Sequence, residues 1–378
     1  MRGGPASRSG ASRPTVASRV THRHRHAPPR SDPRERRADT SGTPPQRVHA
    51  LIQRIWHGFV VVALVATATF VLVRLAPGDP FAAALENARL TPALREQWRA
   101  AYGLDGSIGT QFAHWIASLA RGDLGFSTST NQPVSRAIAA ALPNTLLLLG
   151  TSIVIAFMLG IWLGAVQAAG QGGILDRCIG AITLTGNAVP DFWLALVMLL
   201  AGSYWLRLFP VGGVVDLLMP LNASWPVLLL DRVRHLVLPV LTMVILLVAP
   251  IARLQRTALL DRLGAEWVRT ATAKGVARRA VFRRHAWRTA LGPVVTMAGL
   301  ALPSLFGGAV FIERVFAWPG MGQLAANAVA ARDYHLVVGC VLVGTVMVVI
   351  GSMLADHVST WLDPRLAQDG FETLPGIA

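Results

Sequence analysis

Long apolar segments alternate with polar segments along the chain, after a start that is polar throughout. A helix needs roughly 20 apolar residues to cross about 30 Å of hydrocarbon. Six segments meet that length, although the fourth does so only if it extends to Leu254. The pattern therefore predicts an all-α integral membrane protein with six transmembrane helices. The six segments are 52–73, 138–168, 178–206, 236–251, 291–312 and 336–354.

The polar start of the chain, residues 1–48, is rich in Arg, Ser, Pro and His. Such a composition cannot bury enough apolar surface to offset the chain entropy lost on folding, so we expect a disordered, Arg-rich tail. A full-length apolar segment follows the tail, rather than a short one with a cleavage site. We therefore do not expect the tail to be a cleaved signal peptide.

The loop after the first apolar segment carries helical patterns of its own. Thr91-Pro92 is typical of a helix start, with Thr as N-cap and Pro in the first turn. Phe112, Trp115 and Leu119 would share one face of a second helix. The Gly-Asp-Leu-Gly sequence at 122–125 indicates a turn. We therefore predict a small helical cap in this loop.

The charge distribution predicts the orientation of the chain. The sequence is 53% hydrophobic and 15% charged, whereas soluble domains carry about 25% charged residues. The net charge of +15 is concentrated in the N-terminal tail and in segment 253–288, where ten basic residues accompany Asp261 and Glu266. Four apolar segments separate these basic regions, so both lie on one side, which the positive-inside rule makes the cytoplasm. This clustering also argues against a nucleic-acid-binding protein, which net charge alone would suggest.

Few residues carry recognisable chemistry. Lys274 is the only lysine, and Gly275 follows it where the phosphate-binding loop of an ATPase requires Ser or Thr. Uphill transport would therefore take its energy from a partner or from an ion gradient. Cys178, Cys340 and the scattered histidines show no metal-ligand spacing, and no nucleophile–base–acid set stands out. We therefore expect no enzyme activity, no cofactor and no metal site.

A series of short motifs runs in order through residues 50–365. In this order and spacing, the motifs resemble the permease subunits of the dipeptide, oligopeptide and nickel branch of ABC importers, of the type that opens the permease pair. The wider family signature begins Glu-Ala-Ala where this chain has Arg-Thr-Ala, a form common in the peptide branch. The motifs are RLAPGDP at 74–80, YGLD at 102–105, GDLG at 122–125, LPNT at 142–145, PDFWL at 190–194, RTATAKG at 269–275 continuing to His285, Glu313 followed by PGMGQL at 319–324, RDY at 332–334, and DPR at 363–365.

The resemblance implies that the cytoplasmic loop 257–289 docks onto a separate ATPase subunit. A short helix at 265–274 would place Val268, Ala271 and Thr272 on one side, and Gly275 would end it in the left-handed conformation. The alternative is a basic loop that only sets the topology. The residues implied in coupling are Glu266, Arg269, Thr270, Ala271, Lys274 and Gly275.

Two acidic residues are candidates for the translocation pathway. If the third apolar segment starts near Cys178, Asp191 lies about 20 Å along it, where an ionisable group is expected to face a cavity. If the segment starts near Pro190, Asp191 lies at the membrane interface instead. Glu313 begins an external loop rich in Gly and Pro, which is either a re-entrant segment toward the pathway or an ordinary structured loop.

The resemblance also implies the organisation of the chain and its partners. The chain would form half of the translocation pathway for peptides, nickel or a similar small solute, and its expected partners are a second homologous permease, one or two ATPase subunits that bind ATP, and an extracytoplasmic solute-binding protein. It would be a multi-pass protein of the cell membrane with both termini in the cytoplasm. The expected regions are the tail 1–48, a first transmembrane helix 49–75, an extracytoplasmic helical loop 76–137, a core permease domain 138–365 with five transmembrane helices, and a C-terminal tail 366–378.

Besides a nucleic-acid-binding protein that uses the Arg-rich tail, two other functions compete with this one. A secondary transporter driven by an ion gradient would show inverted repeats and paired broken helices, and no convincing repeat is visible. An intramembrane enzyme would need an acid, base or metal set within its spans, and Asp191 has no visible partner there.

Overall fold

The computed structural model describes residues 44–75, 107–216, 218–220, 222–282 and 286–362. The chain divides into two units, Met1–Arg47 and Val48–Ala378. Several predictions lie wholly or partly outside the described residues. These are the disordered tail, the helix start at Thr91-Pro92, the C-terminal tail, and the motifs at 74–80, 102–105 and 363–365.

The described residues are mostly helical, which confirms the predicted all-α membrane class. Four described helices are long and apolar enough to cross a membrane, or five if one bent pair counts as a single span. A further helix, α11 (Trp287–Val315), covers the fifth predicted segment but is outside that count, so the total of six spans stays a prediction. The four long helices are α1 (Pro44–Leu75), α5 (Val134–Ala169), α8 (Trp225–Leu263) and α13 (Tyr334–Leu362).

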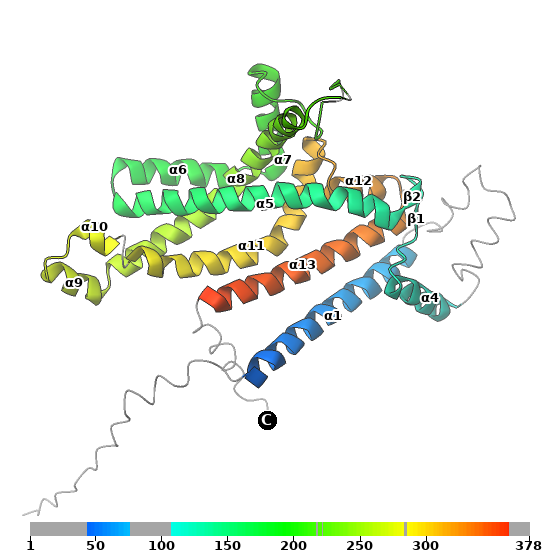
Figure 1. Cartoon of the computed structure of the whole chain (residues 1–378), viewed down its shortest axis with the longest axis horizontal. Helices are drawn as coiled ribbons and strands as arrows, with labels where there is room; N and C mark the ends of the chain where they lie inside the picture. Colours follow the sequence, from blue (N-terminus) through cyan, green and yellow to red (C-terminus); the bar gives the residue numbers. More distant parts are fainter. Residues whose placement is uncertain (1–43, 76–106, 217, 221, 283–285, 363–378) are drawn as a thin grey trace, which may run out of the picture. The chain divides into compact units, whose positions relative to one another are not determined.

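Helices α5 and α8 lie side by side (Figure 1). They pack closely through two glycines of α5. A side chain at Gly160 would bring its Cβ within 2.6 Å of Ile251 Cγ2. At Gly164, a Cβ would collide with the carbonyl oxygen of Ala252. Glycines four residues apart in this way allow two membrane helices to bring their backbones together. The main core continues from this contact to α11, with Leu148, Ile251 and Ile312 fully buried.

Helix α8 is much longer than the apolar segment 236–251 that predicted it. It begins at Trp225, where Pro226 occupies a first-turn position that needs no backbone N–H, and it ends before Gly264. The predicted apolar segment 236–251 was therefore too short at both ends, and the predicted loop 257–289 begins inside the last turns of α8. The reason is that polar side chains such as Arg232 lie exposed on the flanking turns of the same helix. A prediction from hydropathy alone leaves these polar turns out of the helix.

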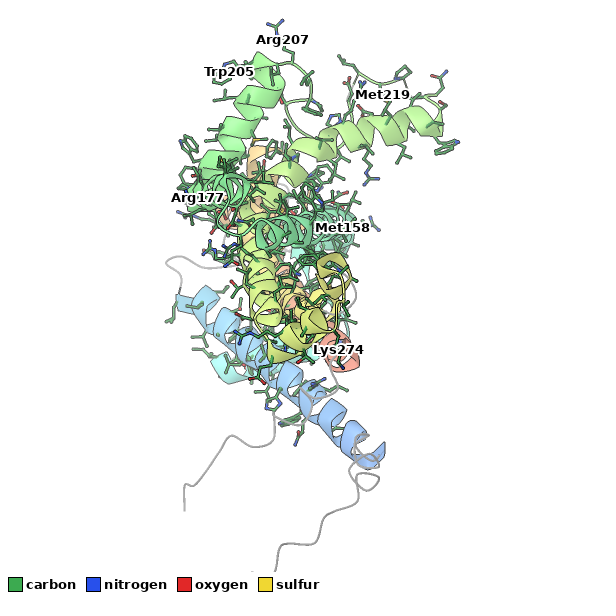
Figure 2. The ribbon with its side chains drawn as sticks, turned by 90° about the vertical axis from the view of Figure 1, so that its left-hand side faces the viewer. Met158, Arg177, Trp205, Arg207, Met219 and Lys274 are labelled. Carbon is green, nitrogen blue, oxygen red and sulfur yellow. The ribbon has the colours of Figure 1, made fainter. Side chains whose placement is uncertain are left out.

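The third apolar segment is a broken helix. It consists of α6 (Ile174–Ala188), α7 (Asp191–Leu199) and a π-helical stretch, η2 (Leu200–Trp205), with a bend of 104° between the α6 part and the α7–η2 part. The break falls at Val189 and Pro190, where proline supplies no backbone N–H to continue α6. Figure 2 shows Trp205 and Arg207 at the tip of the bent part.

A small cap lies at the end of the bundle where α5 and α13 begin. Helix α4 (Ile108–Ala120) confirms the helix predicted there, and the rings of Phe112 and Trp115 lie 5.1 and 5.4 Å from Phe70 of α1. The predicted turn at 122–125 is also present, with positive φ at both glycines. The cap is completed by the antiparallel strands β1 (Phe126–Ser127) and β2 (Gln132–Pro133) and by α12 (Met321–Ala330).

Candidate coupling and translocation sites

The predicted coupling helix is present as α9 (Glu266–Ala273), beyond the end of α8 that is remote from the cap (Figure 1). It ends at Gly275, whose φ of 81° is the left-handed conformation that glycine adopts without strain. Two backbone bonds close this end, from Gly275 N to Thr272 O at 3.0 Å and from Val276 N to Ala271 O at 3.1 Å. This pair of bonds defines a Schellman motif, which confirms the predicted helix stop.

The side chains of α9 are displayed at the surface of the described chain, since none of them is buried. Val268 and Ala271 are half-buried, as expected for one side of the helix. Thr272 was predicted to lie on that side as well, but it is exposed and its hydroxyl donates to Val268 O at 2.8 Å. The predicted coupling residues Glu266, Arg269, Thr270, Lys274 and Gly275 are all exposed.

Asp191 is the first residue of α7 and lies at the break of the third apolar segment, half-buried. On the α6 side of the break, the amide of Asn187 donates to Leu246 O at 3.1 Å. A Cβ at Gly186 would lie 3.0 Å from Ile245 Cγ2. Because Ile245 and Leu246 lie near the middle of α8, the break sits beside the middle of that helix. This position agrees with the alternative in which Asp191 lies well inside the third apolar segment rather than at the membrane interface. Its role in the translocation pathway stays a prediction.

Glu313 lies fully buried in the last turn of α11. Its Oε1 accepts a hydrogen bond of 2.6 Å from Thr145 Oγ1, and its Oε2 accepts one of 3.0 Å from Gln323 N. The Thr145 hydroxyl also accepts a bond of 2.7 Å from Met321 N. The carboxylate therefore joins α11, α5 and the start of α12.

The glycines of the PGMG motif are explained by this carboxylate. A Cβ at Gly320 would collide with the Glu313 carboxylate, and one at Gly322 would lie 2.7 Å from Val310 Cα. The chain therefore approaches the end of α11 closely at both positions, which explains why the loop carries glycine there.

Asn144, the residue before Thr145, extends the same junction. Its Nδ2 donates to Pro319 O, its backbone O accepts from Trp318 Nε1, and its Oδ1 accepts from Arg232 Nη2, each at 3.0 Å. The LPNT and PGMG motifs are therefore two halves of one contact. No pattern in the single sequence paired them, because the two motifs are far apart along the chain.

Asp333, from the RDY motif, joins α13 to the hairpin. Its Oδ1 accepts from Leu336 N at 3.2 Å, as a helix N-cap does, and its Oδ2 accepts from Ser127 Oγ at 2.6 Å and from Ser129 N at 2.9 Å. Burial raises the pKa of this carboxyl, but the hydrogen bonds outweigh it and leave the pKa below its ordinary value. The stabilisation is therefore complete above the unfolded-state pKa and is lost as the pH falls through the folded-state pKa.

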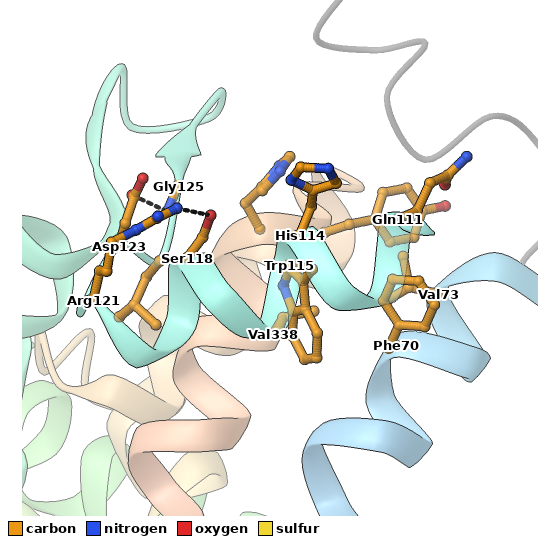
Figure 3. A pocket seen from close by; sticks show the side chains of 13 residues that line it. Phe70, Val73, Gln111, His114, Trp115, Ser118, Arg121, Asp123, Gly125 and Val338 are labelled. Carbon is orange, nitrogen blue, oxygen red and sulfur yellow. Dashed lines mark hydrogen bonds between the residues drawn. The ribbon is translucent and has the colours of Figure 1, made fainter. Parts of the chain in front are cut away.

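A cavity lies between α1, α4 and the start of α13 (Figure 3). Phe70 and Trp115 form part of its apolar wall, while Arg121 donates to Ser118 Oγ at 3.3 Å on its polar side. None of the predicted coupling or pathway residues is among the 13 residues that line it. Among the described residues, no group of three or more His, Cys, Asp or Glu side chains could hold a metal ion.

Comparison with known families identifies the class of the protein. Residues 156–368 match the model of the binding-protein-dependent transport system inner membrane component, and residues 47–149 match the model of the N-terminal part of such components. The chain therefore belongs to this family, and it is a multi-pass membrane protein that serves as the permease subunit of an ATP-driven importer.

Three relatives show where the chain lies within that family. It is 34% identical over 317 residues to the oligopeptide transport system permease protein AppB of Bacillus subtilis (strain 168), covering 84% of this chain and 98% of the relative. It is 34% identical over 335 residues to the probable D,D-dipeptide transport system permease protein DdpB of Escherichia coli (strain K12), covering 85% and 98%. It is 33% identical over 310 residues to the di/tripeptide transport system permease protein DppB of Pseudomonas aeruginosa (strain UCBPP-PA14), covering 79% and 92%.

Proposed function

We propose that this chain is one of two membrane subunits of an importer that carries peptides into the cell, and that ATP is bound and hydrolysed only by partner subunits. The names of the relatives support a peptide substrate, since all three are peptide permeases. Nickel or another small solute is the alternative within the same branch. The second membrane subunit is a homologous permease, and an extracytoplasmic binding protein delivers the solute.

The observation that carries the coupling mechanism is the exposed helix α9. It is a short helix with a sharply defined end and no buried side chain, joined directly to one of the long helices of the core. Such a helix can fill a groove on an ATPase, with its small residues giving close approach and its charges fixing the register. ATP binding would close the ATPase pair, draw the two coupling helices together and open the pathway outward, and hydrolysis would reset it.

The break between α6 and α7 is our candidate for the pathway. Non-helical backbone at membrane depth has to face protein or a water-filled cavity, because lipid offers it no hydrogen bonds. Asp191 would face the solute from the first turn of α7. Glu313 would not contact the solute, because it is fully buried. It would support the pathway indirectly, by holding α5 and α11 together at the predicted outer side of the bundle.

Uptake of a radiolabelled tripeptide by cells tests this function. We expect uptake to require this chain, the binding protein and a partner ATPase with an intact phosphate-binding lysine. If uptake persists with an inactive ATPase and stops when a protonophore collapses the ion gradient, the chain is a secondary transporter instead.

A further inference from the structure

A partly buried ion pair joins α6 to α8 at the end of the bundle that carries α9. Arg256 Nε donates to Asp176 Oδ1, and Arg256 Nη2 donates to Asp176 Oδ2, both at 2.8 Å. The Asp176 side chain is only 7% exposed, and the Arg256 side chain is 30% exposed. A bidentate pair of this kind fixes orientation as well as distance, because two nitrogens of the guanidinium bond to the two oxygens of the carboxylate.

The remaining polar groups around Asp176 tie it to the turn between α5 and α6. Gly172 N donates to Asp176 Oδ2 at 2.9 Å, and the Gln167 amide donates to Asp176 O at 3.1 Å. Asp176 therefore holds the end of α5, the turn and the first turn of α6 around one side chain of α8.

Helix α6 is attached to α8 at its other end too, through the bond from Asn187 to Leu246 O. Helix α6 therefore runs antiparallel to α8 over nearly the whole length of α6, since Asp176 contacts Arg256 and Asn187 contacts Leu246. Helix α5 is locked to α8 as well, because Gly160 and Gly164 leave no space between the two backbones. At the end of the bundle that carries α9, helices α5, α6 and α8 are therefore joined to one another, and α9 continues from α8 after only Gly264 and Ala265.

An ion pair is a poor choice for stability alone. Removing two charges from water costs several kcal/mol, and apolar side chains of similar size would often hold two helices together as well. What the pair adds is a fixed rotation and register of α6 on α8. Register matters here because α6 leads directly to the break at Val189-Pro190.

We propose that Asp176 and Arg256 are positioning residues that make α6 follow α8 when a partner ATPase moves α9, so that the coupling helix controls the broken segment beside the middle of α8. This inference rests on the proposed function, since it needs an ATPase that acts on α9. It assigns a role to two residues that the sequence motifs did not single out.

The test uses the assembled transporter, with its second permease, ATPases and binding protein, in proteoliposomes. Peptide uptake and ATP hydrolysis are measured on the same preparation for Arg256→Gln and Asp176→Asn. We expect both variants to assemble and to hydrolyse ATP, while the amount of peptide carried per ATP falls about tenfold. The matched control is Arg177→Gln, which removes an exposed arginine from α6 beside Asp176 and should leave that ratio unchanged.

Arg256→Lys covers the case in which the Gln variant does not assemble. Lysine keeps the charge but lacks the planar fork, so this variant should assemble and still carry less peptide per ATP. The proposal is overturned if uptake and hydrolysis fall together in proportion to the assembled complex, or if peptide carried per ATP is unchanged. Failure of the proposed function itself would be seen separately, as wild-type transporter that takes up no peptide with ATP.

Discussion

Thr145 is the residue through which two distant motifs meet. Its single hydroxyl donates to the buried Glu313 carboxylate and accepts from Met321 N, so it uses both its hydrogen and a lone pair. Both partners lie in places that water does not reach, because Glu313 is fully buried and Met321 is 5% exposed. Loss of this hydroxyl would leave two buried polar groups without a partner.

We therefore expect Thr145→Val to destabilise the protein. Valine has nearly the same shape as threonine, so the change removes the hydroxyl and little else. Unsatisfied buried groups cost about 1–3 kcal/mol, which should lower the thermal denaturation midpoint of the purified protein in detergent.

Thr151→Val, on the same helix, is the control for this change. Its hydroxyl bonds only to Leu147 O and Leu148 O of its own helix. This variant should denature close to wild type. Equal midpoints for the two variants would show that the Thr145 junction adds no stability.

Asp191 is the residue on which the proposed pathway depends. If its carboxylate faces the solute, Asp191→Leu should lower peptide uptake by about tenfold or more, the effect of losing an interaction of about 1.4 kcal/mol. Assembly with the partners should survive, since the residue is half-buried and starts a helix. Asp191→Asn separates charge from shape, and near-normal uptake by the Leu variant would exclude Asp191 from the pathway.

The sequence predicted single residues best where backbone geometry alone decides. The left-handed Gly275 and the turn glycines at 122 and 125 need no knowledge of the rest of the fold. The Thr145–Glu313 contact could not be predicted in this way, since its residues are 168 positions apart. The same holds for Asp176 and Arg256, which are 80 positions apart and look like ordinary helix-end charges in the sequence.

At the scale of elements, hydropathy located the helices but not their ends or breaks. The first apolar segment, 52–73, lies inside α1, but the helix begins earlier, at Pro44, and ends at Leu75. Helix α8 was predicted too short, because its polar first and last turns lie outside the apolar segment 236–251. The bend after α6 could be suspected at Pro190, but its angle depends on packing against α8.

The end of α9 gives the prediction that belongs to this scale. Gly275 has positive φ, and a Cβ added there would meet no atom of this chain within 4 Å. The strain of a side chain at this position is therefore conformational, about 1–2 kcal/mol, and any steric clash would come from a partner. Gly275→Val should weaken co-purification with the ATPase and abolish both peptide uptake and peptide-stimulated ATP hydrolysis, while membrane insertion persists.

Gly264→Ala and Gly275→Ala form a matched pair for this test. Both sites have room for a methyl group, but Gly264 has an ordinary φ of −79° and Gly275 does not. We expect the first to behave as wild type and the second to be impaired. If Gly275→Val retains both transport and ATPase binding, α9 is not the coupling helix, and the gradient-driven transporter becomes the better interpretation.

At the scale of the whole molecule, the predicted orientation gives the two ends of the bundle different functions: one end would receive the solute and the other would contact the ATPase. The cap, with α4, the hairpin and α12, would face the outside, where a binding protein delivers solute. Helix α9 lies beyond the remote end of α8 (Figure 1), and its basic surroundings predict that it lies in the cytoplasm. Cysteine labelling can test this assignment in a variant without Cys178 and Cys340.

Ala117 on α4 and Ala277 after α9 are suitable positions, because both are exposed. Ser129 is a poorer choice in the cap, because it donates two hydrogen bonds to Asp333. On intact cells, or on spheroplasts if an outer membrane is present, an impermeant thiol reagent should label Ala117→Cys and spare Ala277→Cys. Both should be labelled after lysis, which shows that the second site is reactive. The reverse pattern would show that the predicted orientation is wrong. Helix α9 would then lie outside the cell, where it could not contact a cytoplasmic ATPase.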